Sequence, residues 1–461
     1  MLCGVQAFVI FVLKYNLIAA LSLNTLPEDP KLNFTGLATK HGLPPIEYKV
    51  ITEDHYILTL YRLPGTSRYP VLLMHGISDS SDTFLLREET SLGITLARDG
   101  YDVWFGNSRG NRYSREHVYL NPDKNDTYWD FSFHEMGYYD LPAIIDIILN
   151  ETGAPSVTAI GHSQGNTIFY VLGSTRREYN SKINVMIALA PISYLHHSII
   201  VSPLIPISPV IEAIVNELKI NEFLGDNSVI TRILRRVCPV PVIGYAVCIL
   251  GIMFPISGYD PAELGESFVP IFGEHFPTGT SAKDFLHFLQ VGKNKKFARY
   301  DYGTQMNQAV YNSTNPPIYD LEKVTMPIAL LAGKNDFLSS LEDVAILRKQ
   351  LPNVVYYLVN PRSQMNHLDY IWVVAALITC SLLRWESESS SLGVSVGIMG
   401  GALLVILLVL YRQPRGSVAN LSFKVPLVPL VPFLSVCLNV YLMVQLHYQT
   451  WVRFIIWLGY W

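Results

Sequence analysis

The residues best suited to chemistry are five consecutive ones, Gly161-His162-Ser163-Gln164-Gly165, which fit the pattern G-x-S-x-G. Residues 156–160 before them are mostly apolar and predict a short buried strand, and residues 166–173 after them predict a helix packed on a sheet. A serine in a tight strand-to-helix turn is exposed for reaction, and the flanking glycines permit the turn. Although the pattern is common by chance, this context favours Ser163 as a nucleophile.

A nucleophilic serine needs a base and an acid, which follow such a turn in the order acid, then histidine. Asp336 lies in the polar turn after an apolar strand, and His367 follows a second apolar run, residues 354–359. Loops at the carboxyl ends of parallel strands meet at one edge of a doubly wound sheet. Considered alone, Asp336 could equally be an aspartate in a turn or at the N-cap of a helix, and His367 could be an ordinary surface histidine. The order of the three residues along the chain and their positions on strand-end loops favour a catalytic triad. Asp343 and Asp369 are weaker candidates for its acid, because neither directly ends a strand.

The pattern also offers a place for a developing oxyanion. An apolar strand ends in His75-Gly76-Ile77. The backbone N–H of Ile77 and that of Gln164 are the expected donors of an oxyanion hole. His75 and His162 are alternative bases, but we interpret both as structural, His75 in its own turn and His162 beside the nucleophile.

These residues together predict acyl transfer through a covalent serine intermediate. His367 removes the proton of Ser163, Asp336 fixes the imidazole tautomer, and water hydrolyses the acyl-serine. This chemistry needs no cofactor, and we expect neither a cofactor nor a metal. The formal net charge of −4 and the lack of a basic cluster give no support for nucleic-acid binding.

Several further stretches extend the match to a known family. The sequence resembles the acid lipase family, which includes gastric lipase and the lysosomal lipase that hydrolyses cholesteryl esters and triglycerides. The resemblance runs from about Asp29 to about Ala376. The stretches that carry it, besides the G-x-S-x-G pattern, are residues 47–54, 75–77, 100–111, 131–136, 139–143, 333–336 and 366–372.

The resemblance implies an α/β-hydrolase fold with an inserted, mostly helical cap. Carried over position by position, it makes Ser163 the nucleophile, Asp336 the acid and His367 the base, with Ile77 and Gln164 as oxyanion donors. The implied reaction is hydrolysis of carboxylic esters of neutral lipids at a lipid–water interface, either triglycerides or cholesteryl esters. The alternatives are an esterase for smaller soluble esters and a membrane-tethered lipid-binding protein without activity.

The resemblance also divides the chain into parts. Residues 24–195 and 316–376 form the two halves of the hydrolase core, and residues 196–315 form the cap. Within the cap, two apolar stretches, 198–215 and 239–256, are interrupted by prolines, so we interpret them as cap segments rather than bilayer helices. We expect part of the cap to be a lid whose opening exposes a docking patch, although these stretches could simply pack on the core.

Other features indicate the secretory pathway. Residues 1–23 are apolar and end in small residues, which favours a signal peptide, with an uncleaved anchor as the alternative. In the cap, the family often has a short-range disulfide where Cys238 and Cys248 lie. The expected destination is outside the cell or the lysosome. The candidate N-glycosylation sites are Asn33, Asn125, Asn150 and Asn312.

The last part of the chain departs from the acid lipases. After a polar linker, residues 377–391, comes a membrane tail, residues 392–461, with an uncharged apolar segment at 392–411. Arg412 and Arg415 follow at once, which predicts a cytosolic loop and places the hydrolase on the lumenal or outer side.

The membrane tail resembles the last spans of cationic amino acid transporters. Two or three terminal helices cannot enclose a midplane substrate site, so we expect no transport. The tail is therefore either a gene fusion that tethers the lipase to a membrane or a gene model that joins two neighbouring genes.

Overall fold

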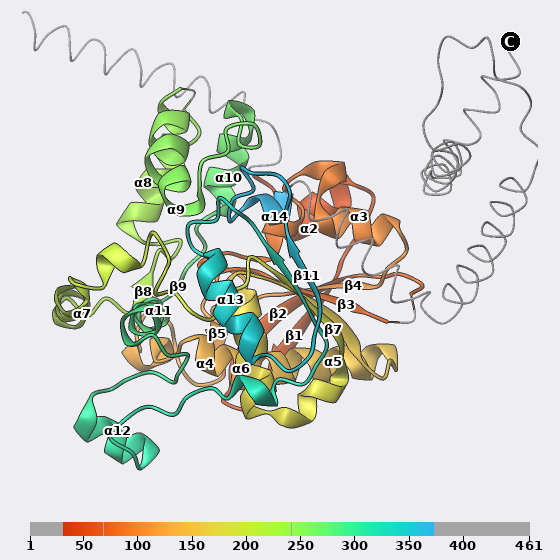
Figure 1. Cartoon of the computed structure of the whole chain (residues 1–461). Helices are drawn as coiled ribbons and strands as arrows, with labels where there is room; N and C mark the ends of the chain where they lie inside the picture. Colours follow the sequence, from red (N-terminus) through yellow and green to blue (C-terminus); the bar gives the residue numbers. More distant parts are fainter. Residues whose placement is uncertain (1–30, 68, 241, 373–461) are drawn as a thin grey trace, which may run out of the picture. The chain divides into compact units, whose positions relative to one another are not determined.

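The computed structural model describes residues 31–67, 69–240 and 242–372 (Figure 1). The chain divides into two compact units, residues 1–380 and 381–461. The predicted signal peptide and the predicted membrane tail both lie outside the described residues. Within the described residues, no helix combines the length and the apolar character that crossing a bilayer requires.

A nine-stranded sheet forms the centre of the first unit, with strand order β1-β2-β4-β3-β6-β7-β10-β11 and β5 paired to β2. Strands β4, β3, β6, β7, β10 and β11 run parallel, whereas β1, β2 and β5 pair antiparallel. The central strands β3, β4, β6 and β10 are buried along their whole length, as expected for parallel strands covered on both faces. The strand bounds are β1 (Ile46–Ile51), β2 (Tyr56–Leu63), β3 (Val71–Met74), β4 (Val103–Gly106), β5 (Glu116–His117), β6 (Val157–His162), β7 (Ile183–Leu189), β10 (Ile328–Ala332) and β11 (Val354–Val359).

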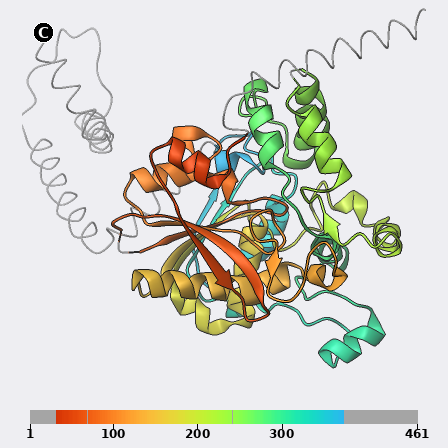
Figure 2. The ribbon, with the colours of Figure 1, turned by 180° about the vertical axis from the view of Figure 1, so that it is seen from behind.

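Helices cover both faces of this sheet. Figures 1 and 2 show α5 and α6 on one side and α2 and α3 on the other. Of α6, only Thr175 is not buried, because the helix is wedged between the sheet and its neighbours. The helices of the core are α2 (Phe34–Lys40), α3 (Leu92–Arg98), α4 (Phe133–Glu135), α5 (Leu141–Thr152), α6 (Gln164–Thr175), α13 (Leu341–Gln350) and α14 (Asp369–Trp372).

The segment between β7 and β10 is mostly helical, and it includes the range expected to form the cap. In the first apolar stretch two short helices, each with a proline in its first turn, follow one another. In the second stretch a π-helix runs directly into a short α-helix that has a proline in its first turn. A two-stranded sheet, β8 (Glu222–Phe223) with β9 (Thr280–Ser281), lies within it. Its helices are α7 (Ser208–Glu217), α8 (Val229–Val237), the π-helix η8 (Tyr245–Met253), α9 (Phe254–Ser257), α10 (Val269–His275), α11 (Ala282–Asn294) and α12 (Thr304–Tyr311).

Short turns of helix connect these elements. The π-helix η5 (Met136–Asp140) joins α4 to α5. The remaining short helices are of the 3-10 type: η2 (Ser81–Phe84), η3 (Glu88–Thr90), η4 (Asp126–Trp129), η6 (Arg177–Lys182), η7 (Ser202–Leu204), η9 (Glu266–Phe268) and η10 (Leu321–Lys323).

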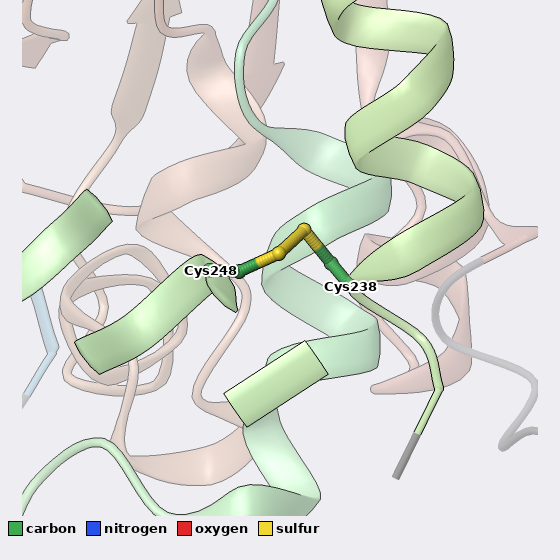
Figure 3. The surroundings of a disulfide bond; sticks show 2 residues. All are labelled: Cys238 and Cys248. Atoms are coloured by element: carbon green, nitrogen blue, oxygen red, sulfur yellow. A yellow bond between two sulfur atoms is a disulfide. The ribbon is translucent and has the colours of Figure 1, made fainter. Parts of the chain in front are cut away.

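A disulfide joins Cys238, at the end of α8, to Cys248 in η8 (Figure 3). The two Cα atoms are 5.7 Å apart, and both residues are buried. The bond therefore ties two consecutive helical segments, α8 and η8, to each other.

Candidate active site

Ser163 occupies the sharp turn between β6 and α6. Its backbone adopts φ 54° and ψ −118°, a conformation that L-residues rarely adopt. The N–H of Ser163 donates to the carbonyl of Leu189 on β7 (3.0 Å), which anchors the turn to the neighbouring strand. A Cβ at Gly161 would lie 2.7 Å from Asn166 Oδ1, and one at Gly165 would lie 2.4 Å from the carbonyl oxygen of Met74. Both positions therefore require glycine, because neighbouring atoms come too close to leave room for a Cβ.

The structure brings Ser163, His367 and Asp336 into one chain of contacts. Nε2 of His367 lies 2.8 Å from Ser163 Oγ, and its Nδ1 lies 2.9 Å and 3.0 Å from the two carboxylate oxygens of Asp336. A carboxylate only accepts, so Nδ1–H donates to Asp336 and Nε2 is left to accept from the serine hydroxyl. All three residues are buried.

The carboxylate of Asp336 is fixed by its own loop. Its Oδ1 also accepts the backbone N–H groups of Leu338 (3.0 Å) and Ser339 (2.7 Å). Ser339 in turn donates its hydroxyl to the carbonyl of Pro191, just beyond β7. The loop after β10 is therefore pinned to the end of the adjacent strand, which sets the direction from which Asp336 meets the imidazole.

The turn after β3 lies directly against the nucleophile. A Cβ at Gly76 would come within 3.3 Å of Ser163 Cβ. Among the described residues, no hydrogen bond leaves the backbone N–H of Ile77 or that of Gln164. Two free donors beside a nucleophilic serine are what an oxyanion hole needs.

His75 holds this turn. Its Nε2 accepts from the N–H of Ser108 (3.1 Å) and from the side-chain amide of Asn111 (3.2 Å), so its Nδ1–H donates to the carbonyl of Gly76 (2.8 Å). Burial lowers the pKa of His75 to about 4, which keeps the ring neutral. With both ring nitrogens engaged, His75 is not in a position to act as the base.

The loop that holds His75 also carries a buried arginine, Arg109. Arg109 follows β4, and its guanidinium donates to Asp140 (2.6 Å) and Asp54 (2.6 Å) while lying 3.9 Å from the ring centre of Tyr56. This charge is fully paired, as a buried charge must be. Ser108 and Asn111, which hold His75, flank Arg109 in the same loop. Arg109 therefore indirectly stabilises the turn after β3, residues 75–77, which is the candidate oxyanion turn.

The two weaker acid candidates make other contacts. Asp369 Oδ2 accepts the backbone N–H of Asn366 (2.8 Å), which shapes the loop that carries His367. The carboxylate of Asp343 contacts His196 and His197 instead. Of the three acids considered, Asp336 is the one in contact with the imidazole.

Asp284 is a site residue that sequence reasoning missed. It lies on helix α11, in the segment between β7 and β10, and its Oδ2 accepts from the side-chain amide of Gln164 (2.9 Å) and the hydroxyl of Thr280 (3.0 Å). Its Oδ1 accepts the N–H of Phe133 (2.7 Å), and burial raises its pKa to about 7. Helix α11 is thereby joined to the residue after Ser163. No sequence pattern near Asp284 marks this contact.

A mostly parallel sheet with a serine at a strand–helix turn and an acid and a histidine after later strands has the architecture of the α/β-hydrolases. Two family models match the chain: "Partial alpha/beta-hydrolase lipase region" over residues 34–88 and "alpha/beta hydrolase fold" over residues 69–207. The α/β-hydrolase prediction is confirmed.

Comparison with similar proteins identifies the family of α/β-hydrolases to which the chain belongs. Lipase 1 of Drosophila melanogaster is 37% identical over 357 residues, which is 77% of this chain and 79% of that protein. Gastric triacylglycerol lipase of Mus musculus is 36% identical (76% of this chain, 90% of that protein), and the human lysosomal acid lipase/cholesteryl ester hydrolase is 35% identical (76% and 89%). The chain belongs to the acid lipase family and is a serine hydrolase of carboxylic esters.

The tail also matches a family model. Residues 423–460 match the model described as "C-terminus of AA_permease". The resemblance of this part of the chain to amino acid transporters is therefore confirmed at the level of sequence.

Proposed function

We propose that the protein is a lipase that hydrolyses the ester bonds of neutral lipids, triglycerides or cholesteryl esters. The observation that carries this proposal is the contact chain from Ser163 Oγ through the His367 imidazole to the Asp336 carboxylate. Relatives that bear the names gastric triacylglycerol lipase and lysosomal acid lipase/cholesteryl ester hydrolase support the substrate class.

The geometry supports a two-step mechanism. As Ser163 Oγ attacks the ester carbonyl, its proton passes to Nε2 of His367, and the Asp336 carboxylate stabilises the imidazolium that forms. The backbone N–H groups of Ile77 and Gln164 receive the carbonyl oxygen as it becomes negative. His367 then protonates the departing alcohol, and afterwards activates the water that releases the fatty acid from Ser163.

The surface of the cap supports a lipid rather than a soluble substrate. Helices α7 and α8 expose large aliphatic side chains to solvent, several of them more than half exposed. Exposed apolar patches of this kind mark contact with a membrane or another apolar surface. The exposed large aliphatic residues on these two helices are Val210, Ile214, Val229, Ile230 and Ile233.

The proposed setting is the secretory pathway, with the protein secreted or lysosomal. The four candidate glycosylation sites, Asn33, Asn125, Asn150 and Asn312, are all exposed, so a glycan could be attached to each without disturbing the core. Mass spectrometry of the protein made in a eukaryotic secretory host tests this assignment. Absence of glycan at all four sites would contradict it.

The deciding experiment replaces the nucleophile. Ser163→Ala should lower kcat for a long-chain triglyceride by on the order of 10⁶, whereas Ser181→Ala, at an exposed serine, should leave it unchanged. Full ester hydrolysis by Ser163→Ala would exclude the proposed mechanism. No hydrolysis of any ester by the unaltered protein would favour a lipid-binding protein without activity.

A second comparison separates lipase from esterase. We expect higher kcat/KM for emulsified long-chain triglyceride or cholesteryl ester than for a short soluble ester. The opposite preference would identify an esterase for small esters.

A further inference from the structure

Three side chains gather where the first residues of the cap meet helix α13: His196, His197 and Asp343. Nδ1 of His197 lies 2.9 Å from Asp343 Oδ1, and Nδ1 of His196 lies 3.3 Å from the same oxygen. The two imidazole centres are 4.0 Å apart, and the three candidate ligand atoms all lie within 4.8 Å of one another. Neither the family match nor the triad accounts for this cluster.

Hydrogen bonding explains only part of the arrangement. His197 donates both its backbone N–H (3.0 Å) and its ring Nδ1–H (2.9 Å) to the Asp343 carboxylate. Nδ1 of His196 is also close to that carboxylate, yet it is buried and has no hydrogen-bond partner among the described residues. A buried ring nitrogen without a partner needs a reason, and an absent ligand is one of the usual reasons.

The spacing fits a metal ion. Four ligands placed 2.0–2.1 Å from a tetrahedral zinc ion are about 3.3 Å from one another. The two nitrogen-to-oxygen distances, 2.9 Å and 3.3 Å, are close to this value. Coordination through Nδ1 of His197 requires the other neutral tautomer, in which the ring proton is on Nε2 and the ion replaces the hydrogen bond to Asp343.

We propose that His196, His197 and Asp343 bind one divalent transition-metal ion, with Zn²⁺ as the best fit and a water molecule as the fourth ligand. Two imidazole nitrogens and one carboxylate suit zinc, whereas Ca²⁺ and Mg²⁺ prefer oxygen ligands alone. The His197 side chain is 45% exposed and the Asp343 side chain 2% exposed, so an ion has a route in from solvent to a buried carboxylate.

The bound ion would connect the cap to the loop of the catalytic acid. The residues directly after the two histidines already lie along that loop, since Ser198 Oγ (2.9 Å) and the N–H of Ile199 (3.0 Å) both donate to the carbonyl of Phe337. Asp343 lies in the first turn of α13, just beyond the same loop. Metal binding is therefore a structural clamp, which is separate from the ester chemistry at Ser163.

Direct metal binding to the full-length protein without a histidine tag tests the proposal. After dialysis against Zn²⁺, the protein should retain one ion per chain, and Zn²⁺ should raise its Tm because the ion binds the folded state alone. His197→Gln and His196→Gln should each weaken zinc affinity by more than the roughly 10–100-fold that loss of an outer-shell partner costs. Co²⁺ in place of Zn²⁺ should give the intense visible absorption of a tetrahedral site.

A matched control uses another histidine that contacts a carboxylate. His41 lies 3.1 Å from Glu89 through Nδ1, and the metal-ligand cluster does not include it, so His41→Gln should bind zinc as the unaltered protein does. Circular dichroism of each variant checks that it is folded. Failure of the folded unaltered protein to retain zinc, or retention of full affinity in His196→Gln and His197→Gln, would overturn the proposal. Neither readout depends on lipase activity.

Discussion

The Nε2–H of His162 donates a 2.7 Å hydrogen bond to the backbone carbonyl of His367, so the residue before the nucleophile holds the loop of the base. Burial lowers the pKa of His162 to about 3, and the ring is therefore a neutral donor well above that pH. Two histidines of the site thus have different tasks. In the proposed mechanism His367 exchanges a proton with Ser163, and His162 fixes the position from which this happens.

Removal of that donor should lower kcat while KM changes little. Loss of a buried hydrogen bond costs about 1–3 kcal/mol, so His162→Phe should reduce kcat roughly 10- to 100-fold by loosening the His367 loop. His162→Gln retains an N–H near the Nε2 position and should recover part of the loss. Steady-state kinetics of both variants on one ester checks this, and equal kcat in all three proteins would contradict it.

Asp336→Asn should abolish most of the activity without unfolding the protein. The amide nitrogen can donate but not accept, so it turns the imidazole to the tautomer in which Nε2 carries a proton and cannot take one from Ser163. A similar exchange in another serine hydrolase lowers kcat by about 10⁴, and we expect a loss of that order. The control is Asp320→Asn at the exposed Asp320–Lys323 pair, which should be fully active.

Glycine at position 165 is required by space rather than by backbone conformation. A Cβ there would lie 2.4 Å from the carbonyl oxygen of Met74 and 2.9 Å from that of His75, both at the end of β3. Gly165→Ala should therefore push α6 away from the oxyanion turn and destabilise the fold by several kcal/mol, on the order of the larger single-residue effects known.

Gly265→Ala is the matched control, because Gly265 has φ −76° and no atom within 4 Å of an added Cβ. Chemical denaturation should show a lower free energy of unfolding for Gly165→Ala and an unchanged or slightly higher one for Gly265→Ala. Equal stability of the two variants would show that a side chain at position 165 fits beside the carbonyl groups of Met74 and His75, contrary to the structure.

The parts of the site that depend on local sequence could be predicted, and those that depend on distant contacts could not. The strands before Asp336 and His367 are continuous apolar runs and the strand before Ser163 is mostly apolar, so their order along the chain predicts where each loop meets the others. Asp284 contacts Gln164 across 120 positions of sequence, and nothing in its own neighbourhood points to that partner.

The same distinction applies to Asp343 and Asp369. Sequence reasoning considered both only as substitutes for Asp336, because carboxylates near a strand end look alike. The partners of Asp343 are two histidines, of which His197 lies 146 positions earlier in the sequence, so they depend on how distant segments pack. The partner of Asp369 is local, the backbone N–H of Asn366 three positions before it.

Asp369 also makes the stability of the protein depend on pH, because it lies against a second buried acid. Both Asp260 and Asp369 are fully buried, and Arg362 pairs with Asp260 (2.6 Å). Burial, and after it the charge of Asp260, raises the pKa of Asp369 to about 8. The folded protein therefore keeps a proton on Asp369 that the unfolded chain loses near pH 4.

The sign of the effect follows from linkage. Between about pH 4 and pH 8 the folded state binds more protons at this position than the unfolded state does, so this contribution to stability is greatest in acid and falls as pH rises. Asp369→Asn cannot titrate. The free energy of unfolding of the unaltered protein minus that of Asp369→Asn should then fall by up to about 1.4 kcal/mol per pH unit over this range.

Measuring this difference rather than the stability of one protein is essential, because buried histidines act in the opposite direction. Burial lowers the pKa of His134 and of His287 to about 3, so folding loses stability at these positions as pH falls below about 6.5. Both histidines are present in Asp369→Asn as well, and their contribution cancels in the difference.

Urea unfolding of the two proteins at pH 5, 6, 7 and 8 gives the slope, and the two curves should run parallel above about pH 8. A difference that does not change between pH 5 and pH 8 would mean that Asp369 is already ionised in the folded protein, with Arg362 neutralising both carboxylates.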